Sequence, residues 1–285
     1  MSWGIKSAHA FSSPGRTPAE CAAQTNLYEV DVGGVPGPKL DARLVELTGR
    51  RARRMGRFMQ LAVTGAVEAA KKSGLQLPPA RTGVFLATGL GNISDLFPFS
   101  HAVFGDPGFH VSAIQFANSV GNAGAFHIAQ ALGLNGPVLA VSQDEVSFEA
   151  ALLQAVTLLD GGDLDLALVG AVDVVMPKVS DHLARLGLPP DAPVKLGEGS
   201  AWWVLGPVGA DDHGVLEDVT LGFRSGPPGL FATRDFESGM NYAQSALYPT
   251  LFLGTAAPGE TFETTARTRE GLTGFTRVVK GAGRS

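Results

Sequence analysis

The sequence has few charges, almost no cysteine and no long hydrophobic run. Charged residues make up 17% of its 285 residues, and the net charge of -5 gives no electrostatic basis for binding nucleic acid. Cys21 is the single cysteine, which excludes an internal disulfide framework and a multi-cysteine metal site. Because no cation lies near Cys21 in the sequence, we interpret it as an inert free thiol. No window approaches the about 20 apolar residues that span a bilayer, and the N-terminus lacks an apolar signal core. We therefore expect a cytoplasmic protein without a membrane contact.

What is abundant indicates a folded α/β protein. Apolar residues form 45% of the chain and glycine occurs 37 times, which is typical of a packed fold with many turns. The length is about twice that of a typical single domain, so one large or two fused α/β units are expected. Strand-like and helix-like segments alternate along the chain, which predicts a mostly parallel sheet with helical crossovers.

The individual elements follow from hydrophobic periodicity and from Gly and Pro positions. Strands are predicted at residues 2–12, 82–88, 136–142, 164–173, 200–206 and 214–223, with 136–142 and 164–173 buried. Helices are predicted in the region from 41 to 73, at 118–132 and in the stretch that ends at Asp160, and residues 13–38 are predicted as loop. The tail after residue 225 has a weak pattern: 249–255 and 274–281 look like strands, and 259–270 between them like a helix.

Four blocks of the sequence resemble the β-ketoacyl synthases. RRMGRFMQLAVTGAVEAA (53–70) is similar to their R-R-M-D-R-F-x-Q helix, and VFLATGLGN (84–92) to the glycine-rich turn after a strand. Residues 118–173 resemble the nucleophile region of that family from end to end. KLGEGSAWWVL (195–205) is similar to the G-E-G-A strand that closes the first half of those enzymes. The blocks keep the family's order and spacing over about residues 1–206.

The resemblance implies a thiolase-like α/β fold. That fold has two similar βαβαβαββ halves, which form a five-layered sandwich and pair into dimers. Residues 1–206 would be a mostly complete first half, and residues 207–285 a reduced C-terminal remnant that is not an independent domain. The resemblance implies neither a cofactor nor a metal.

The same resemblance places Glu145 where the family has its nucleophilic cysteine. Alignment on GP at 136–137, GGD at 161–163 and GAVD at 170–173 requires no gap. A carboxylate at the start of a helix is electrostatically favourable, but the anhydride it would form with an acyl group is more reactive than the thioester. Glu145 is therefore not expected to carry out condensation, and no catalytic residue is expected.

The histidines of the second half are missing as well. Active family members use an H-G-T-G-T block and an N-x-F-G-F-G-G turn to decarboxylate the malonyl donor. The chain has six histidines, the last of which is His213, and neither block is present. His127 lies where the family often has a histidine, and we interpret it as a packing residue rather than a catalytic one.

The resemblance implies a non-catalytic partner of an active β-ketoacyl synthase, similar to the chain-length factors of polyketide and aryl polyene pathways. In that family the segment equivalent to 111–122 reaches across the dimer and lines the partner's acyl tunnel. The expected contacts with the tunnel or the partner are Gln115, Phe116, Ser119, Val138 and Ala140. Core packing is the alternative for Phe116. The last two residues lie on the 136–142 strand, whose unpaired apolar edge would need to be covered.

Three alternatives remain. An arginine cluster is either a contact for an acidic acyl carrier protein or a solvated helix face with structural ion pairs. Its members are Arg50, Arg51, Arg53, Arg54 and Arg57. Gln143 suggests a malonyl-carrier decarboxylase, because loading-module ketosynthases have glutamine in place of the cysteine, although here the glutamine lies two residues before that position. A stand-alone scaffold or acyl-carrier-binding protein is the third class.

Glu145 is also a candidate cap of the following helix, in competition with Ser142 and Asp144.

Overall fold

The computed structural model describes residues 2–13, 17–18, 40–49, 55–105, 113–175, 178–185, 187–234 and 241–283. Within these residues, nine strands form one sheet in the order β3-β2-β4-β5-β1-β6-β9-β8-β7. The strands are β1 (Trp3–Ser12), β2 (Thr82–Ala87), β3 (Val138–Val141), β4 (Leu166–Asp173), β5 (Gly199–Gly206), β6 (Gly214–Phe223), β7 (Gly229–Ala232), β8 (Thr261–Arg267) and β9 (Leu272–Lys280). The helices are α2 (Leu40–Thr48), α3 (Arg57–Ser73), α4 (Ile93–Phe104), α5 (Ala113–Ser119), α6 (Ala123–Leu132), α7 (Ser147–Asp160), α8 (Val179–Arg185) and α9 (Gln244–Thr255), with a 3₁₀ turn η3 (Asp144–Val146).

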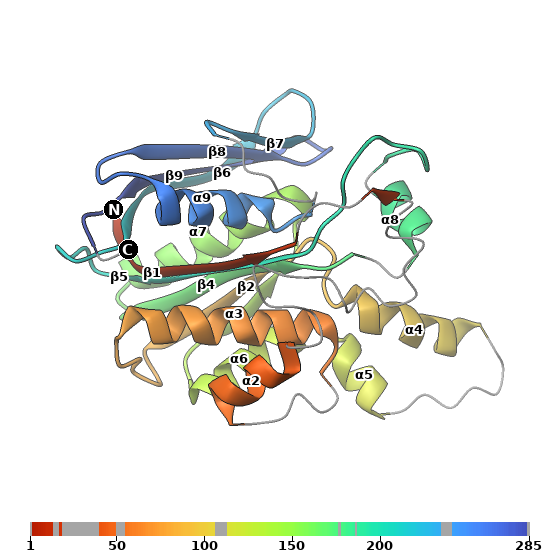
Figure 1. Cartoon of the computed structure of the whole chain (residues 1–285), viewed down its shortest axis with the longest axis horizontal. Helices are drawn as coiled ribbons and strands as arrows, with labels where there is room; N and C mark the ends of the chain where they lie inside the picture. Colours follow the sequence, from red (N-terminus) through yellow and green to blue (C-terminus); the bar gives the residue numbers. More distant parts are fainter. Residues whose placement is uncertain are drawn as a thin grey trace.

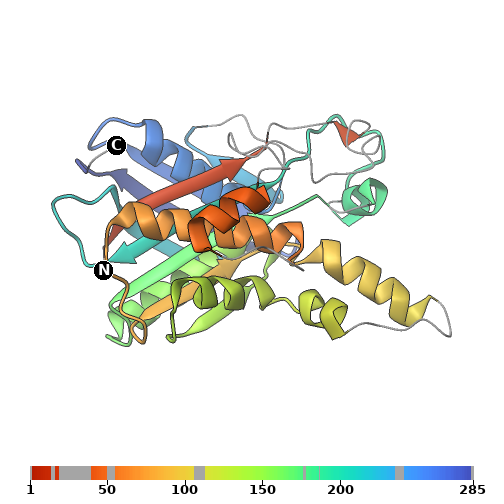
Figure 2. The same cartoon turned by 60° about the horizontal axis from the view of Figure 1, so that its bottom comes forward.

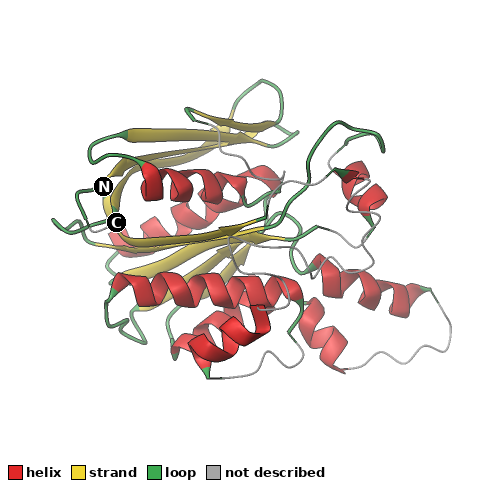
Figure 3. Cartoon of the chain, in the orientation of Figure 1, coloured by secondary structure: helices red, strands yellow, loops and turns green. Residues whose placement is uncertain are grey.

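The elements stack in four layers, because the sheet bends around two of the helices. Helices α2, α3 and α6 cover one face of β1, β2, β4 and β5, and α7 and α9 cover the other face (Figure 1). Strands β6, β8 and β9 then close over α7 and α9 from the far side (Figure 3). No described helix covers the outer face of these last strands. The described residues therefore form four layers and not the five of the expected sandwich.

The expectation of a mostly parallel sheet is wrong. Only β2 pairs in parallel, with β3 on one side and β4 on the other. The six remaining pairings are antiparallel, from β4 with β5 through to β7 with β8. A helix separates every two successive strands only as far as β5, and in the sheet order from β4 to β7 each strand runs antiparallel to the next.

One arrangement of a helix and three strands occurs twice in the chain. In the first copy, α7 leads into β4, β4 pairs antiparallel with β5, and β5 pairs antiparallel with β1. In the second, α9 leads into β8, β8 pairs antiparallel with β9, and β9 with β6. The repeats meet where Trp3–Ile5 of β1 pairs with Gly214–Leu216 of β6. A second half is therefore present in reduced form, and its sheet continues that of the first half.

Helix α3 is the helix of the first half that the sequence shows most clearly. Its residues from 57 to 70 are buried except Gln60, and Gly74 ends it with the left-handed φ of 65° expected at a C-terminal glycine. Its Gly65 lies so close to β5 that a Cβ there would be 2.7 Å from Trp202 Cδ1, so this contact needs glycine. The helix therefore lies directly on the centre of the sheet.

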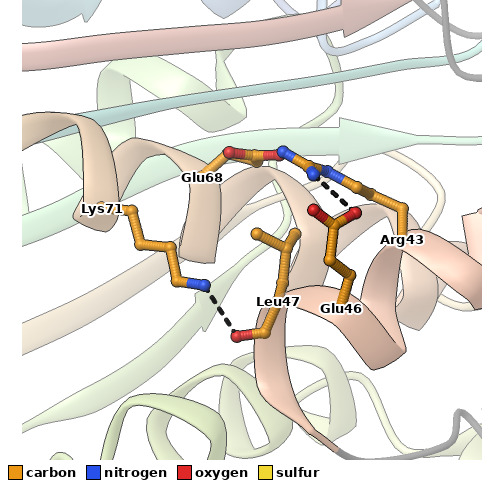
Figure 4. Close-up of polar contacts among 5 residues, drawn as sticks. All are labelled: Arg43, Glu46, Leu47, Glu68 and Lys71. Atoms are coloured by element: carbon orange, nitrogen blue, oxygen red, sulfur yellow. Dashed lines mark hydrogen bonds and ion pairs between the residues drawn. The ribbon is translucent and has the colours of Figure 1, made fainter.

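Helix α2 is attached to α3 by polar contacts (Figure 4). Arg43 donates to the carboxylates of Glu46 at 2.8 Å and Glu68 at 2.7 Å. Lys71 Nζ donates to the backbone oxygen of Leu47 at 2.9 Å. The predicted helical region from 41 to 73 is thus two packed helices, whose connection at 50–54 lies outside the described residues.

The tail differs from its predicted pattern. Residues 249–255 belong to helix α9 and not to a strand, and 261–267 form strand β8 within the segment predicted as a helix. Helix α9 lies between two layers of sheet and is buried on nearly all sides, so its sequence has no polar face that would show a helical period. Strand β8 alternates inward Phe262, Thr264 and Ala266 with less buried residues, a period-two pattern that its polar composition conceals.

Other predicted elements agree with the structure. The predicted first strand and the strands at 164–173, 200–206, 214–223 and 274–281 are confirmed with small shifts at their ends. The predicted helix at 118–132 is interrupted: α5 ends at Ser119 and α6 begins at Ala123. Helices α4 and α8 and strand β7 were not predicted. The predicted loop at 13–38 lies almost wholly outside the described residues.

Candidate functional site

The elbow is the sharp bend between β3 and α7, formed by Ser142–Val146. Asp144 has a φ of 48°, and it is the one non-glycine residue with positive φ in the described chain. The Ser147 hydroxyl accepts a hydrogen bond from the Gln143 backbone N–H at 2.8 Å and lies 2.7 Å from the backbone oxygen of Asp144. These contacts fix an unfavourable backbone conformation, as is common at functional sites.

The glycine-rich turn after β2 lies beside the elbow and is fixed by Asp173 at the end of β4. The buried carboxylate of Asp173 accepts hydrogen bonds from Thr88 Oγ1 at 2.9 Å and from the backbone N–H groups of Gly89 and Leu90 at 3.0 Å each. Ser147 Oγ also lies 3.1 Å from the backbone oxygen of Thr88. Two of the blocks that carry the family resemblance are thus joined in a single hydrogen-bond network around the elbow.

The predicted caps do not occupy the N-cap positions at the elbow. The N-cap residues are Gln143 for η3 and Val146 for α7, and neither helix has a side-chain cap. Glu145, Ser142 and Asp144, the suggested caps, therefore do not occupy the N-cap positions. The Ser147 hydroxyl stabilises this helix start instead, because it accepts a hydrogen bond from a backbone N–H upstream of it.

A pocket of about 250 Å³ opens beside Glu145, and the tail supplies most of its walls. Its lining residues are Glu145, Leu188, Pro228, Gly229, Leu230, Asn241, Tyr242, Gln244, Ser245 and Arg269. Tyr242 packs onto the glycine-rich turn, where a Cβ on Gly89 would lie 2.2 Å from its ring. Arg269, in the turn between β8 and β9, lies against Gly187, whose φ is 69°. The second half of the chain therefore completes a site at the elbow.

Burial is the main cause that raises the pKa of Glu145 above its ordinary value of 4.5. The nearby carboxylates of Asp144 and Glu270 raise this pKa further. The backbone N–H of Glu145 and the Arg269 guanidinium act in the opposite direction, without cancelling the rise. The Glu145 side chain therefore binds a proton more readily than an exposed glutamate does.

A second glutamate lies one helical turn behind the first. Glu149 is 0% exposed, and neither of its carboxyl oxygens has a hydrogen-bond partner. Burial raises its pKa to about 7, and its own backbone N–H and the nearby Ser245 only partly oppose this rise. The Ser245 hydroxyl, 2% exposed, makes no hydrogen bond of ordinary geometry within the described residues either. The two groups thus lie together behind the pocket wall, close enough for Ser245 to affect the pKa of Glu149.

The sequence analysis missed Glu149, Ser245, Arg269 and Glu270. Glu149 follows Glu145 by four residues, a spacing that places both on one face of a helix. The Thr-Arg-Glu-Gly turn at 268–271 carries charges between two strands, which is the kind of position where functional residues are common. Ser245 gave no signal, since only the packing of α9 brings it to the elbow.

Three of the predicted partner contacts lie on α5, a helix with no buried residue. Phe116 is 59% exposed and its ring packs only loosely on Phe99, with ring centres 5.9 Å apart. Phe116 is therefore not part of the core. Ser119 donates to the backbone oxygen of Phe116 at 2.8 Å, and Gln115 is half-buried. The structure brings these residues to the surface and away from the pocket.

Val138 and Ala140 lie on β3, which is an edge strand of the described sheet. Val138 is 38% exposed and Ala140 is half-buried, so the strand is not buried as its sequence predicted. Helix α6 packs beside β3, and α5 and α4, which precede α6 in the sequence, lie along the same side (Figure 2). Eight of the twelve exposed large apolar residues in the described chain lie between 96 and 138: Leu96, Val103, Phe104, Ile114, Phe116, Val120, Phe126 and Val138. We call these eight residues the apolar side.

Arg57 has a different role from the one considered for the arginine cluster. It is 4% exposed, and its Nε lies 2.6 Å from Oε2 of Glu198, which is 2% exposed. The Arg57 charge is thus paired with Glu198 inside the protein, so we do not include Arg57 in the proposed contact with a carrier protein. The arginines at 50, 51, 53 and 54 and Cys21 lie outside the described residues.

His127 lies in the α2, α3 and α6 layer, on the opposite face of the sheet from α7. It lines a small space with Leu44, Met55 and Val63, and burial lowers its pKa. This position agrees with a packing role. Gln143 is exposed and is absent from the pocket lining.

The mixed sheet, the fixed glycine-rich turn and the elbow before α7 define an α/β protein of the thiolase-like fold. The family model "Beta-ketoacyl synthase, N-terminal domain" matches residues 19–192, which is more than half of the chain. The chain belongs to the β-ketoacyl synthase family. No curated protein matches its sequence.

Solved structures with the same fold include ketosynthase and chain-length-factor assemblies. "The ishigamide ketosynthase/chain length factor" is 16% identical, with a TM-score of 0.71 over 99% of this chain and 100% of that chain. "AntDE:AntF", a type II polyketide synthase acyl-carrier protein in complex with its ketosynthase, is 12% identical, with a TM-score of 0.66 over 98% and 99%. A ketosynthase (ApeO) in complex with its chain length factor (ApeC) from Xenorhabdus doucetiae is 13% identical, with a TM-score of 0.57 over 98% and 100%. At these identities the likeness concerns the fold.

Among the described helices, none combines the length and the apolar character needed to cross a membrane.

Proposed function

We propose that this chain is a non-condensing, chain-length-factor-like subunit that pairs with an active β-ketoacyl synthase and shapes its acyl tunnel. The pathway we propose is of the polyketide, aryl polyene or fatty-acid type. The observation that carries the proposal is Glu145 at the elbow, where this family has its nucleophilic cysteine. The proposal also includes contact with an acyl carrier protein and a cytoplasmic location.

The chemistry around Glu145 opposes condensation. A carboxylate that attacked a thioester would form an anhydride, which is higher in energy than the thioester it replaces. The chain has no histidine after His213, so the tail that lines the pocket cannot supply an imidazole. Each of these two features is enough to prevent the family's reaction.

The pocket also opposes the alternative of a malonyl-carrier decarboxylase. The carboxylates of Asp144, Glu145 and Glu270 line a hollow beside the guanidinium of Arg269, and this hollow shares Glu145, Tyr242 and Arg269 with the pocket, so we call it the mouth of the pocket. The malonyl carboxylate would meet like charges there, which disfavours its binding. Release of CO2 from malonyl carrier by the purified chain would overturn this conclusion.

The apolar side supports a protein partner. An unpaired strand edge beside exposed aromatic rings is a surface that proteins usually cover. Phe104 is 87% exposed, Phe116 59% and Phe126 56%, and aromatic side chains are enriched in interface cores. A second ketosynthase-fold chain that presents its own corresponding strand would extend the sheet across β3 and bury these rings.

Co-purification tests the proposal. The chain is co-expressed with a ketosynthase encoded beside it, and both proteins are expected to elute together with condensing activity that the chain alone lacks. Val138→Lys places a charge on the β3 edge and should abolish co-elution, whereas Val208→Lys, at a residue 55% exposed after β5, should not. Equal co-elution of both variants would remove β3 from the interface.

Restoring the nucleophile provides a second test. Glu145→Cys is expected to leave the chain without condensing activity on its own, because the missing histidines are not restored. Elongation of an acyl thioester by the unmodified chain alone would overturn the proposed function.

A further inference from the structure

The mouth of the elbow pocket is acidic. Asp144, Glu145 and Glu270 face one guanidinium, that of Arg269, and Tyr242 completes the rim. The Arg269 guanidinium is also packed against Gly187, so it is fixed to one side of the opening. A molecule that enters therefore meets more negative charge than positive charge.

The deep wall of the same pocket contains an unpaired hydroxyl. Ser245 lines the pocket, is 2% exposed, and its Oγ has no hydrogen-bond partner in the described chain. Glu149 lies near Ser245, and within the described residues neither of its carboxyl oxygens has a hydrogen bond of ordinary geometry. Buried polar groups without partners are costly, on the order of 1–3 kcal/mol each. A ligand that donates a hydrogen bond to Ser245, while Ser245 donates to Glu149, would satisfy both groups at once.

The remaining walls are mixed and the space is small. Leu188, Pro228 and Leu230 supply apolar surface, and the amides of Asn241 and Gln244 also line the pocket. The volume of about 250 Å³ holds about eight water-sized groups. The pocket thus fits a compact molecule with one polar end and a short aliphatic part.

We propose that this pocket binds a small primary alkylamine, with its ammonium group between Glu145 and Ser245 and its aliphatic part along Leu188 and Leu230. An ammonium group has three donors and no acceptor, which matches the Glu145 carboxylate and the Ser245 hydroxyl oxygen that line the pocket. A carboxylate ligand is opposed by the three acidic groups at the mouth, and an alcohol gains no charge pairing. The site does not depend on the proposed pairing with a ketosynthase.

Titration calorimetry with three ligands of equal chain length tests the proposal. Hexylamine, hexanol and hexanoate are titrated into the full-length protein in phosphate buffer, which contains no competing amine. Because a hydrogen bond to a charged group contributes about 1.5–3 kcal/mol, hexylamine should bind at least about tenfold more tightly than hexanol. Hexanoate should bind most weakly. Equal binding of all three ligands, tightest binding of hexanoate, or no binding of hexylamine would overturn the proposal.

Matched variants locate the binding. Glu145→Gln should reduce hexylamine binding to about the level of hexanol, and Ser245→Ala should weaken it as well. Glu260→Gln is the control, since this exposed glutamate precedes β8 at the end of the strand remote from Arg269. Unchanged hexylamine binding in Glu145→Gln would also overturn the assignment. Co-elution with a ketosynthase is a separate measurement, so failure of either hypothesis is seen independently of the other.

Discussion

The side chain of Glu149 in α7 lies directly against the main chain of Gly274 in β9. A Cβ at position 274 would lie 2.7 Å from Cγ of Glu149 and 2.8 Å from its Cβ. Helix α7 begins at the elbow and β9 belongs to the tail, so this contact joins the two halves next to the pocket. The glycine is needed because the helix and the strand approach too closely for any side chain between them.

Gly274→Ala is therefore expected to destabilise the protein by about 1–3 kcal/mol, because the new methyl group clashes with the inner part of the Glu149 side chain. Urea unfolding followed by circular dichroism measures this change. Gly222→Ala in β6 is the matched control, since a Cβ there meets nothing within 4 Å. If both variants were equally stable, the close approach of α7 to β9 would be wrong.

Glu149 should make the stability of the protein depend on pH. Its pKa is about 7 in the folded state against 4.5 as its ordinary value, so the unfolded chain loses this proton first as the pH rises. The stability contribution of Glu149 should therefore fall from pH 4.5 to about pH 7 and stay low above that range. The total loss is on the order of 3 kcal/mol.

Glu149→Gln tests this linkage because glutamine has a similar shape and no titration. Relative to the unmodified protein, the variant should gain stability at pH 8 compared with pH 5, as measured by urea unfolding at both values. Glu260→Gln, at an exposed site, should not change the pH profile. An identical pH profile for Glu149→Gln and the unmodified protein would show that the buried carboxyl does not titrate in this range.

The buried pair of Arg57 and Glu198 should be sensitive to the loss of either partner. Arg57→Met leaves a buried carboxylate uncompensated and is expected to cost about 3–5 kcal/mol. Arg57→Met combined with Glu198→Gln should lose much less than the sum of the two single changes. Arg81→Met breaks an exposed pair with Asp165 at 2.8 Å and should change the stability little. Additive losses in the double variant would show that the two residues are not coupled.

Phe116→Ala should change the products of a heterodimer without affecting the fold, because the side chain is 59% exposed. If the ring lines the partner's tunnel, its removal enlarges the space and should give longer acyl chains, as measured by mass spectrometry. Phe223→Ala, at a residue 78% exposed on β6, should leave the products unchanged. An unaltered product length in Phe116→Ala would exclude this ring from the tunnel.

Residues 1–206 should not fold without the tail, and we propose the same for residues 207–285. Truncation after 206 removes β6 from the edge of β1 and exposes α7, and it leaves the Trp203 indole without Thr250, its partner at 2.7 Å. Such a fragment is expected to aggregate or to lack cooperative thermal unfolding. A chain that ends at residue 283 should behave like the full-length protein. Cooperative unfolding of the 1–206 fragment would make it an independent domain.

The sequence by itself determined the first half, and it is the source of our proposal that Glu145 replaces the nucleophile. Helix α3 and strands β4 and β5 are predicted well because their burial follows directly from long apolar patterns. The position of Glu145 followed from motif spacing, which does not change with packing. A helix or strand can be predicted from its own hydrophobic pattern when each of its faces is either buried or exposed along its whole length.

Only the tertiary structure decided the architecture of the tail and the site it completes. Helix α9 is enclosed between two layers of one sheet, so no polar stripe marked it as a helix. Arg57 could be separated from the neighbouring arginines only once Glu198, 141 residues later in the chain, was seen beside it. Ser245 and Arg269 meet Glu145 because β6 continues the sheet from β1 and turns the tail over α7. Such long-range contacts leave no local periodicity, because the partner that gives each residue its role lies far away in the sequence.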